Sequence, residues 1–138
     1  MNKAATLAVA LLCLWHLGLR RHGMGLPMIS DEGEYAVQAQ TLAEGRVPYR
    51  DAYNQKPPLV FFLYRLAFAC FGENAQAPRL LAVLFCWAAM ICLFLTTPLQ
   101  WGLPARLAPA AIFGVLSTEP IGDMGFAAYF QDTEGNVL

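Results

Sequence analysis

The fold class is decided by the stretch RLLAVLFCWAAMICLFLTTPLQWGLPAR, residues 79–106. Between its two terminal arginines it contains no charged residue. Residues 80–97 are long enough, as a helix, to cross the hydrocarbon core of a bilayer. Pro98 then predicts a turn, and residues 107–118 begin a further apolar segment. The stretch therefore predicts a helical hairpin in a membrane.

The composition extends this interpretation to the whole chain. Of the 138 residues, 57% are hydrophobic and 14% are charged, and the mean hydropathy is +0.44. Soluble domains are roughly 45–50% apolar and about 25% charged. A net charge of −1 offers no basic surface, which excludes the usual electrostatic basis for binding nucleic acid. We therefore expect an all-α membrane protein whose surface contacts membrane lipids.

A second uncharged run, residues 4–19, lies near the N-terminus between Lys3 and Arg20. It is slightly shorter than the roughly 20 residues that span hydrocarbon, but its flanking cations can extend to the headgroups. A signal peptide is the alternative, although the small-x-small cleavage pattern is missing. We predict about three transmembrane helices, near residues 4–20, 79–97 and 105–120.

The outer loop between the first two spans, residues 21–78, is predicted to contain two interfacial helices. Asp31 precedes Glu34 by the spacing of a capping box and Gly45 suits a helix end, which predicts a helix over 32–44. A second helix is expected over 59–72. At 1.5 Å per residue it would be about 21 Å long, so we interpret it as interfacial or partly inserted, with a short tilted span as the alternative.

The charges near the spans do not fix the orientation, because Lys3 and the arginines of the first loop favour opposite topologies. Two spans separate the loop 21–78 from the segment 121–138. Both are therefore expected on the same side of the membrane, provided that residues 59–72 do not cross it.

An ordered series of motifs runs through the first loop: Asp31-Glu32-x-x-Tyr35, Gly45-x-x-Pro48-Tyr49-x-Asp51, Lys56-Pro57-Pro58, Phe71-Gly72 and Arg79-Leu80. In this order the motifs resemble the N-terminal part of the GT-C fold glycosyltransferases that depend on polyprenyl phosphate. The resemblance is to the family-39-like set, which includes protein O-mannosyltransferases and lipid A aminoarabinose transferases, and it covers roughly residues 1–118.

The resemblance implies a partial GT-C fold and an inverting transfer of a sugar. The donor would be a polyprenyl-phosphate sugar, and the acceptor a lipid, a glycan or a protein outside the cytoplasm. It also implies that the first loop lies on the outer side of a bacterial plasma (inner) membrane.

Asp31 matches the family's catalytic acidic position, where a carboxylate takes a proton from the acceptor hydroxyl. The spacing alone explains Asp31 as a helix cap, and the two roles are compatible. Glu32 completes the acidic pair and would orient the base or the acceptor, or be a solvated carboxylate at a helix start. Glu34 is expected to be structural.

Lys56 is the expected phosphate ligand, because a fixed cation at a helix start stabilises the negative charge of the departing polyprenyl phosphate. The alternative is a lysine that binds anionic lipid generally. Tyr35 would contact the lipid phosphate or the sugar, or serve as an interfacial aromatic. Arg79 would pair with the phosphate or with an acidic residue, and Arg65 is a weaker candidate.

A second acidic set, Glu119, Asp123, Asp132 and Glu134, follows the third span. In the resembled family a carboxylate of this loop often lies near the active site, sometimes in a metal-binding pair. The segment QDTEGNVL departs from the Asn-Thr-Glu pattern expected there. The four cysteines and two histidines show no metal-ligand spacing either. We assign no metal and no certain cofactor.

Glycosyltransferases of this kind have many more spans, and three spans do not enclose both a lipid donor and an acceptor. We therefore expect an N-terminal fragment that is inactive alone. Two alternatives stay open. One is a small integral membrane interaction protein whose loop binds anionic lipid or a partner subunit. The other is one half of a split transferase that needs a complementary chain.

Overall fold

The computed structural model describes residues 3–118, and the regular structure of this part is entirely helical. The elements in order are α1 (Lys3–Met24), α2 (Ser30–Ala43), α3 (Pro58–Phe71), α4 (Gln76–Thr96), the short 3₁₀ helix η1 (Leu99–Trp101) and α5 (Gly102–Leu116). The all-α expectation is confirmed for these residues. The second acidic set, Glu119, Asp123, Asp132 and Glu134, lies outside the described residues.

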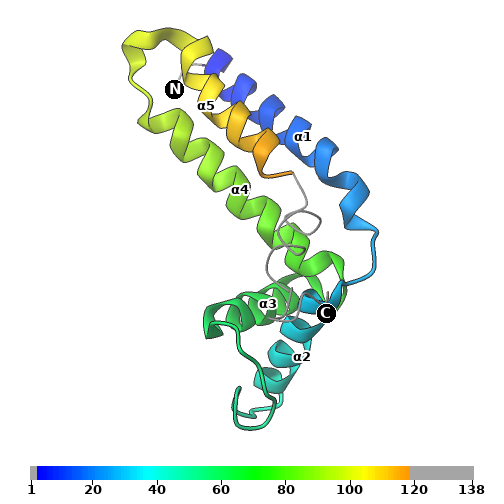
Figure 1. The fold of residues 1–138 in the computed structure, drawn as a ribbon. Coiled ribbons are helices and arrows are strands. Elements are labelled where there is room, and N and C mark those ends of the chain that lie inside the picture. Colours follow the sequence, from blue (N-terminus) through cyan, green and yellow to red (C-terminus); the bar gives the residue numbers. More distant parts are fainter. Residues whose placement is uncertain (1–2, 119–138) are drawn as a thin grey trace, which may run out of the picture.

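The helices form two groups (Figure 1). Helices α1, α4 and α5 lie side by side, with α4 running in the opposite direction to the other two. Helices α2 and α3 pack against each other at the end of this bundle where α1 ends and α4 begins. Helix α3 therefore stays at one end of the bundle instead of running alongside the long helices.

Two helices of the described part, α1 and α4, are long and apolar enough to cross a membrane. Only 11% and 17% of the residues in their most apolar stretches are buried. Most of the apolar side chains are therefore left uncovered, whereas the core helix of a soluble protein would bury them. The third predicted span corresponds to α5, which has 15 residues.

Helices α2 and α3 each end at a glycine with a positive φ. Gly45 has a φ of +73°, and its N–H donates to the carbonyl of Leu42 (3.2 Å) while that of Arg46 donates to Thr41 (3.0 Å). These two bonds form a Schellman motif, in which the left-handed position favours glycine. Gly72, with a φ of +84°, ends α3. Both predicted stops are confirmed.

The predicted capping box of Asp31 and Glu34 is wrong. Helix α2 begins at Ser30, so Asp31 lies inside the first turn, and the cap is Ile29 with an extended backbone. The N–H of Ile29 donates to Oε2 of Glu32 (3.2 Å). Because isoleucine has no side-chain acceptor, Glu32 alone supplies the capping side chain.

Each of the five α-helices begins before its predicted range, and α1 also ends later. Helix α1 continues to Met24 and ends where Gly25 and Pro27, which both disfavour helix, follow in the sequence. Helix α5 begins at Gly102, because Pro104 lies in its first turn, where the missing N–H costs little.

A close polar contact ties α5 to α1 inside the bundle. His16 is fully buried, and its Nε2 lies 3.1 Å from Oγ of Ser117. Arg20 donates to the carbonyl of Ser117 (2.9 Å). Gly114 is also buried, and an added Cβ there would lie 3.3 Å from Cε of Met90. These contacts require a small residue in α5 and fix its last turn against α1 and α4.

Candidate functional site

The five residues singled out by the motifs come together at the end of the bundle where α1 ends and α2 and α4 begin. They form two ion pairs on two adjacent carboxylates of the first turn of α2. One pair joins Arg79 to Glu32, and the other joins Lys56 to Asp31, whose carboxylate also contacts Tyr35. Arg65 belongs to α3 and takes no part in either pair.

The Arg79–Glu32 pair is a two-point contact between planar groups. Nε of Arg79 donates to Oε1 of Glu32 (3.2 Å), and Nη2 donates to Oε2 (2.6 Å). Both side chains are mostly covered, with 16% and 22% of their surface exposed. Asn74 holds the start of α4, one turn before this arginine, by accepting the N–H groups of Gln76 and Ala77.

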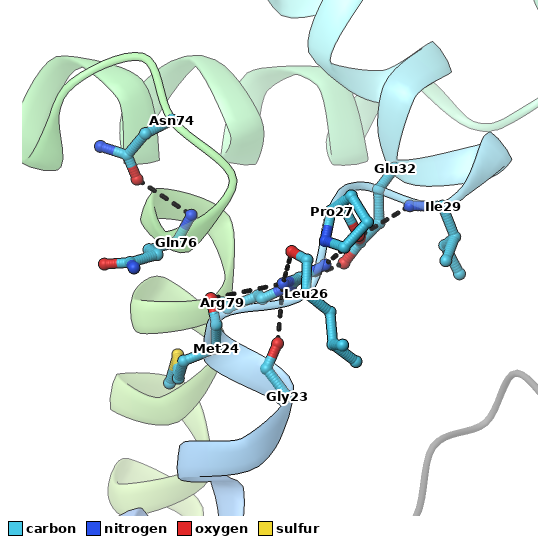
Figure 2. A network of polar contacts seen from close by, with 9 residues as sticks. All are labelled: Gly23, Met24, Leu26, Pro27, Ile29, Glu32, Asn74, Gln76 and Arg79. Carbon is cyan, nitrogen blue, oxygen red and sulfur yellow. Dashed lines mark hydrogen bonds and ion pairs between the residues drawn. The ribbon is translucent and has the colours of Figure 1, made fainter.

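Arg79 also binds the chain between α1 and α2 (Figure 2). Nη1 donates to the carbonyls of Gly23 (2.7 Å) and Leu26 (2.6 Å), and Nη2 donates to that of Pro27 (3.1 Å). An arginine has five N–H donors, and here each has a protein acceptor. Of the two partners expected for Arg79, a phosphate or an acidic residue, the structure shows the acidic residue. A phosphate could bind this guanidinium only if some of these bonds were given up.

The second pair is more open. Nζ of Lys56 lies 3.2 Å from Oδ2 of Asp31, and the hydroxyl of Tyr35 donates to the same oxygen (3.4 Å). The side chain of Lys56 is 34% exposed and that of Asp31 is 20% exposed. The bond to the carboxylate is the main reason that the pKa of Lys56 is raised. Lys56 is therefore positively charged at neutral pH.

An aromatic cluster on α3 holds Tyr35. Its ring meets that of Tyr64 edge to face at 5.4 Å between centroids, and it lies 6.2 Å from the ring of Phe61, which is fully buried. Burial, followed by the nearby charge of Asp31, raises the pKa of Tyr35, so its hydroxyl keeps its proton at neutral pH. Tyr35 therefore acts as a hydrogen-bond donor to Asp31.

Two residues that the sequence analysis missed hold the loop that carries Lys56. Gln38 donates from Nε2 to the carbonyl of Ala52 (3.0 Å), and Asn54 donates to Oε2 of Glu34 (3.3 Å). Oδ1 of Asn54 accepts the N–H of Lys56 (2.8 Å), an Asx-turn. An asparagine two residues before Lys56 was a usable signal for this turn. Gln38 gave none, because its partner is a peptide carbonyl.

The geometry places a carboxylate, a phenol and a partly exposed cation at one end of an apolar bundle. Within residues 3–118, no three His, Cys, Asp or Glu side chains are placed to hold a metal ion. The arrangement can bind an anion at Lys56 and accept a proton at Asp31. A scan against family models and searches of curated proteins and of solved structures found no match to this chain.

Proposed function

We propose that this site is part of an inverting glycosyltransferase of the GT-C type that uses a polyprenyl-phosphate sugar as donor. The acceptor would be a hydroxyl of a lipid, a glycan or a protein. The observation that carries the proposal is the 3.2 Å contact between Lys56 and Asp31, which are 25 positions apart in the chain. These are the two residues to which the motifs assign the phosphate and the proton.

In the proposed reaction the acceptor oxygen attacks the anomeric carbon and gives its proton to Asp31. The bond from that carbon to the phosphate oxygen breaks, and the polyprenyl phosphate leaves with the bonding electrons. The ammonium of Lys56 stabilises the charge that develops on the leaving oxygen. Lysine is protonated at neutral pH, so Lys56 keeps its positive charge for this role after its bond to Asp31 is broken.

The attacking and leaving oxygens lie on opposite faces of the anomeric carbon in an inverting transfer. A bound donor would therefore separate Lys56 from Asp31, since it would draw the ammonium to its phosphate and make room for the sugar. Asp31 would then keep its bond from Tyr35, which lies on the same helix and holds the carboxylate in place.

The proposed location is a bacterial inner membrane, with α1 and α4 as spans and the first loop on the outer side. The outward-facing apolar surfaces of both helices support a lipid surrounding. Helices α2 and α3 would then lie at the membrane surface, where a lipid-linked phosphate also lies. Lys56 precedes α3 and is therefore suitably placed to meet that phosphate.

Binding of undecaprenyl phosphate to the chain in detergent micelles tests the role of Lys56. We expect Lys56→Gln to weaken binding roughly 10- to 100-fold, the effect of losing one charge-assisted hydrogen bond. Arg46→Gln is the matched control, because it removes an exposed cation from the same loop. Equal affinities of Lys56→Gln and the unchanged chain would contradict the phosphate role.

Sugar transfer from a polyprenyl-phosphate sugar tests the role of Asp31. The assay uses membranes that contain this chain together with any complementary chain that sugar transfer requires. Asp31→Asn should lower kcat there about 10²- to 10⁴-fold. Glu44→Gln, at an exposed carboxylate after α2, is the control. A near-normal rate for folded Asp31→Asn would exclude it as the base.

A further inference from the structure

Tyr49 has a backbone conformation that is rare for its residue type. Among the described residues it is the one non-glycine with a positive φ, +68°. A bulky side chain seldom adopts this region, and it does so where the surrounding structure imposes it. Such positions are concentrated at functional sites, so the contacts of Tyr49 are informative.

The side chain of Tyr49 reaches the residue proposed to bind the phosphate. Its hydroxyl donates to the carbonyl of Lys56 at 2.7 Å. Its ring packs on Phe61, with 5.7 Å between centroids, and Phe61 is fully buried in α3. Tyr49 thus links Lys56 to the helix that follows it.

A tight turn imposes the unusual backbone. The N–H of Tyr49 donates to the carbonyl of Ala52 (3.0 Å). Asp51 accepts the N–H of Val47 (2.8 Å) and two bonds from Arg50 (both 2.8 Å). The bond from Arg50 is the main reason that the pKa of Asp51 is held well below its usual range. The Asp51 carboxylate closes the turn through the bond that it accepts from Val47.

We infer that Tyr49 is a positioning residue for Lys56, an inference that rests on the proposed phosphate role of Lys56. The N–H of Lys56 is held by Asn54 and its carbonyl by Tyr49. With both ends of its backbone fixed, Lys56 can move its ammonium between Asp31 and a phosphate by side-chain rotation alone. The hydroxyl of Tyr49 thereby fixes the backbone position from which the Lys56 side chain extends to the donor phosphate.

Two matched substitutions test this inference. Tyr49→Phe removes the hydroxyl and keeps the ring on Phe61. Tyr53→Phe removes a hydroxyl from the same loop, on a side chain that is 81% exposed. We expect the Kd for undecaprenyl phosphate in micelles to rise roughly three- to tenfold in Tyr49→Phe, as for one lost neutral hydrogen bond, and to stay unchanged in Tyr53→Phe.

A double-mutant cycle separates positioning of Lys56 from a general effect on the fold. In the Lys56→Gln background, Tyr49→Phe should cause no further loss of phosphate affinity. An equal loss in both backgrounds, or no loss in the single variant, would overturn the inference. If Lys56→Gln alone leaves the affinity unchanged, the proposed function fails instead. If Tyr49→Phe does not fold, Asp51→Ala, which opens the same turn, replaces it with the same expectations.

Discussion

Two neighbouring carboxylates, Asp31 and Glu32, meet two cations in contrasting ways. Glu32 receives two bonds from Arg79, and every donor of that guanidinium has a protein acceptor. Asp31 receives one bond from Lys56 at 3.2 Å, and more of the Lys56 side chain is exposed. A planar guanidinium suits a fixed contact, whereas a flexible ammonium suits an exchangeable one.

This contrast indicates that Glu32 mainly stabilises the fold, whereas Asp31 is available to interact with a ligand. The Glu32 pair connects the end of α1, the linker and the start of α4, so its loss should affect the fold. The Asp31 pair joins α2 to the loop before α3 by one bond that a ligand can replace. Substitutions in the Arg79–Glu32 pair should therefore lower the free energy of unfolding, and substitutions in the Lys56–Asp31 pair should mainly affect phosphate binding and sugar transfer.

The largest effect on stability is expected for Arg79→Met. This change leaves Glu32 and three peptide carbonyls without their donor, and it should lower the free energy of unfolding by about 2–4 kcal/mol. Unfolding in mixed micelles, followed by circular dichroism, measures the change. Arg21→Met, at an exposed position in the last turn of α1, should stay within about 0.5 kcal/mol of the unchanged chain. Equal free energies of unfolding for Arg79→Met and Arg21→Met would contradict a structural role of the Arg79–Glu32 pair.

A smaller effect is expected when each carboxylate is replaced by its own amide. Glu32→Gln weakens the bidentate contact and should cost about 1–3 kcal/mol in the free energy of unfolding. Asp31→Asn loses a more exposed contact and should cost less than about 1 kcal/mol. The same unfolding experiment ranks the two. A larger loss of unfolding free energy in Asp31→Asn than in Glu32→Gln would contradict the structural role of Glu32.

The smallest effect concerns the pKa of Lys56. Its pKa is raised chiefly because its ammonium donates to Asp31. The stability that this lysine contributes is therefore fully present below its unfolded pKa, about 10.4, and is lost as the pH rises through its folded pKa. Asp31→Asn should lower the pKa of Lys56 towards its ordinary value.

Nuclear magnetic resonance of ¹³C-dimethylated lysines can measure this titration. The chain has two lysines, Lys3 and Lys56, so the signals can be assigned by one substitution. An unchanged Lys56 pKa in Asp31→Asn would mean that the ion pair does not persist in solution.

The sequence was sufficient where the physical cause is local. Glycine is favoured in the left-handed conformation, so the helix ends at Gly45 and Gly72 could be predicted from neighbouring residues. The Pro57-Pro58 pair likewise marks the start of α3. The contact of Lys56 with Asp31 could not be predicted from helix and loop patterns, because these patterns give no such long-range contact. Only the family resemblance implied that both residues belong to one site.

The sequence was insufficient where the partner is a peptide group. The acceptors of Arg79 include backbone carbonyls, which every residue has, so no pattern reveals them. The positive φ of Tyr49 results from a turn closed by Asp51, and tyrosine itself does not favour it. The capping box was assigned to the wrong pair because Ile29 is not a residue that caps with its side chain.

The carbonyl acceptors of Arg79 have a consequence for sequence variation. Any residue placed at position 23 or 26 still offers a carbonyl, so these two side chains can change without the loss of a bond to Arg79. Arginine alone has five donors in one fork, and lysine could not replace it. Proteins that share this arrangement should keep Arg79 and an acid at position 32, while the side chains at positions 23 and 26 vary. One side chain would then preserve the shape of a segment in which several residues are interchangeable.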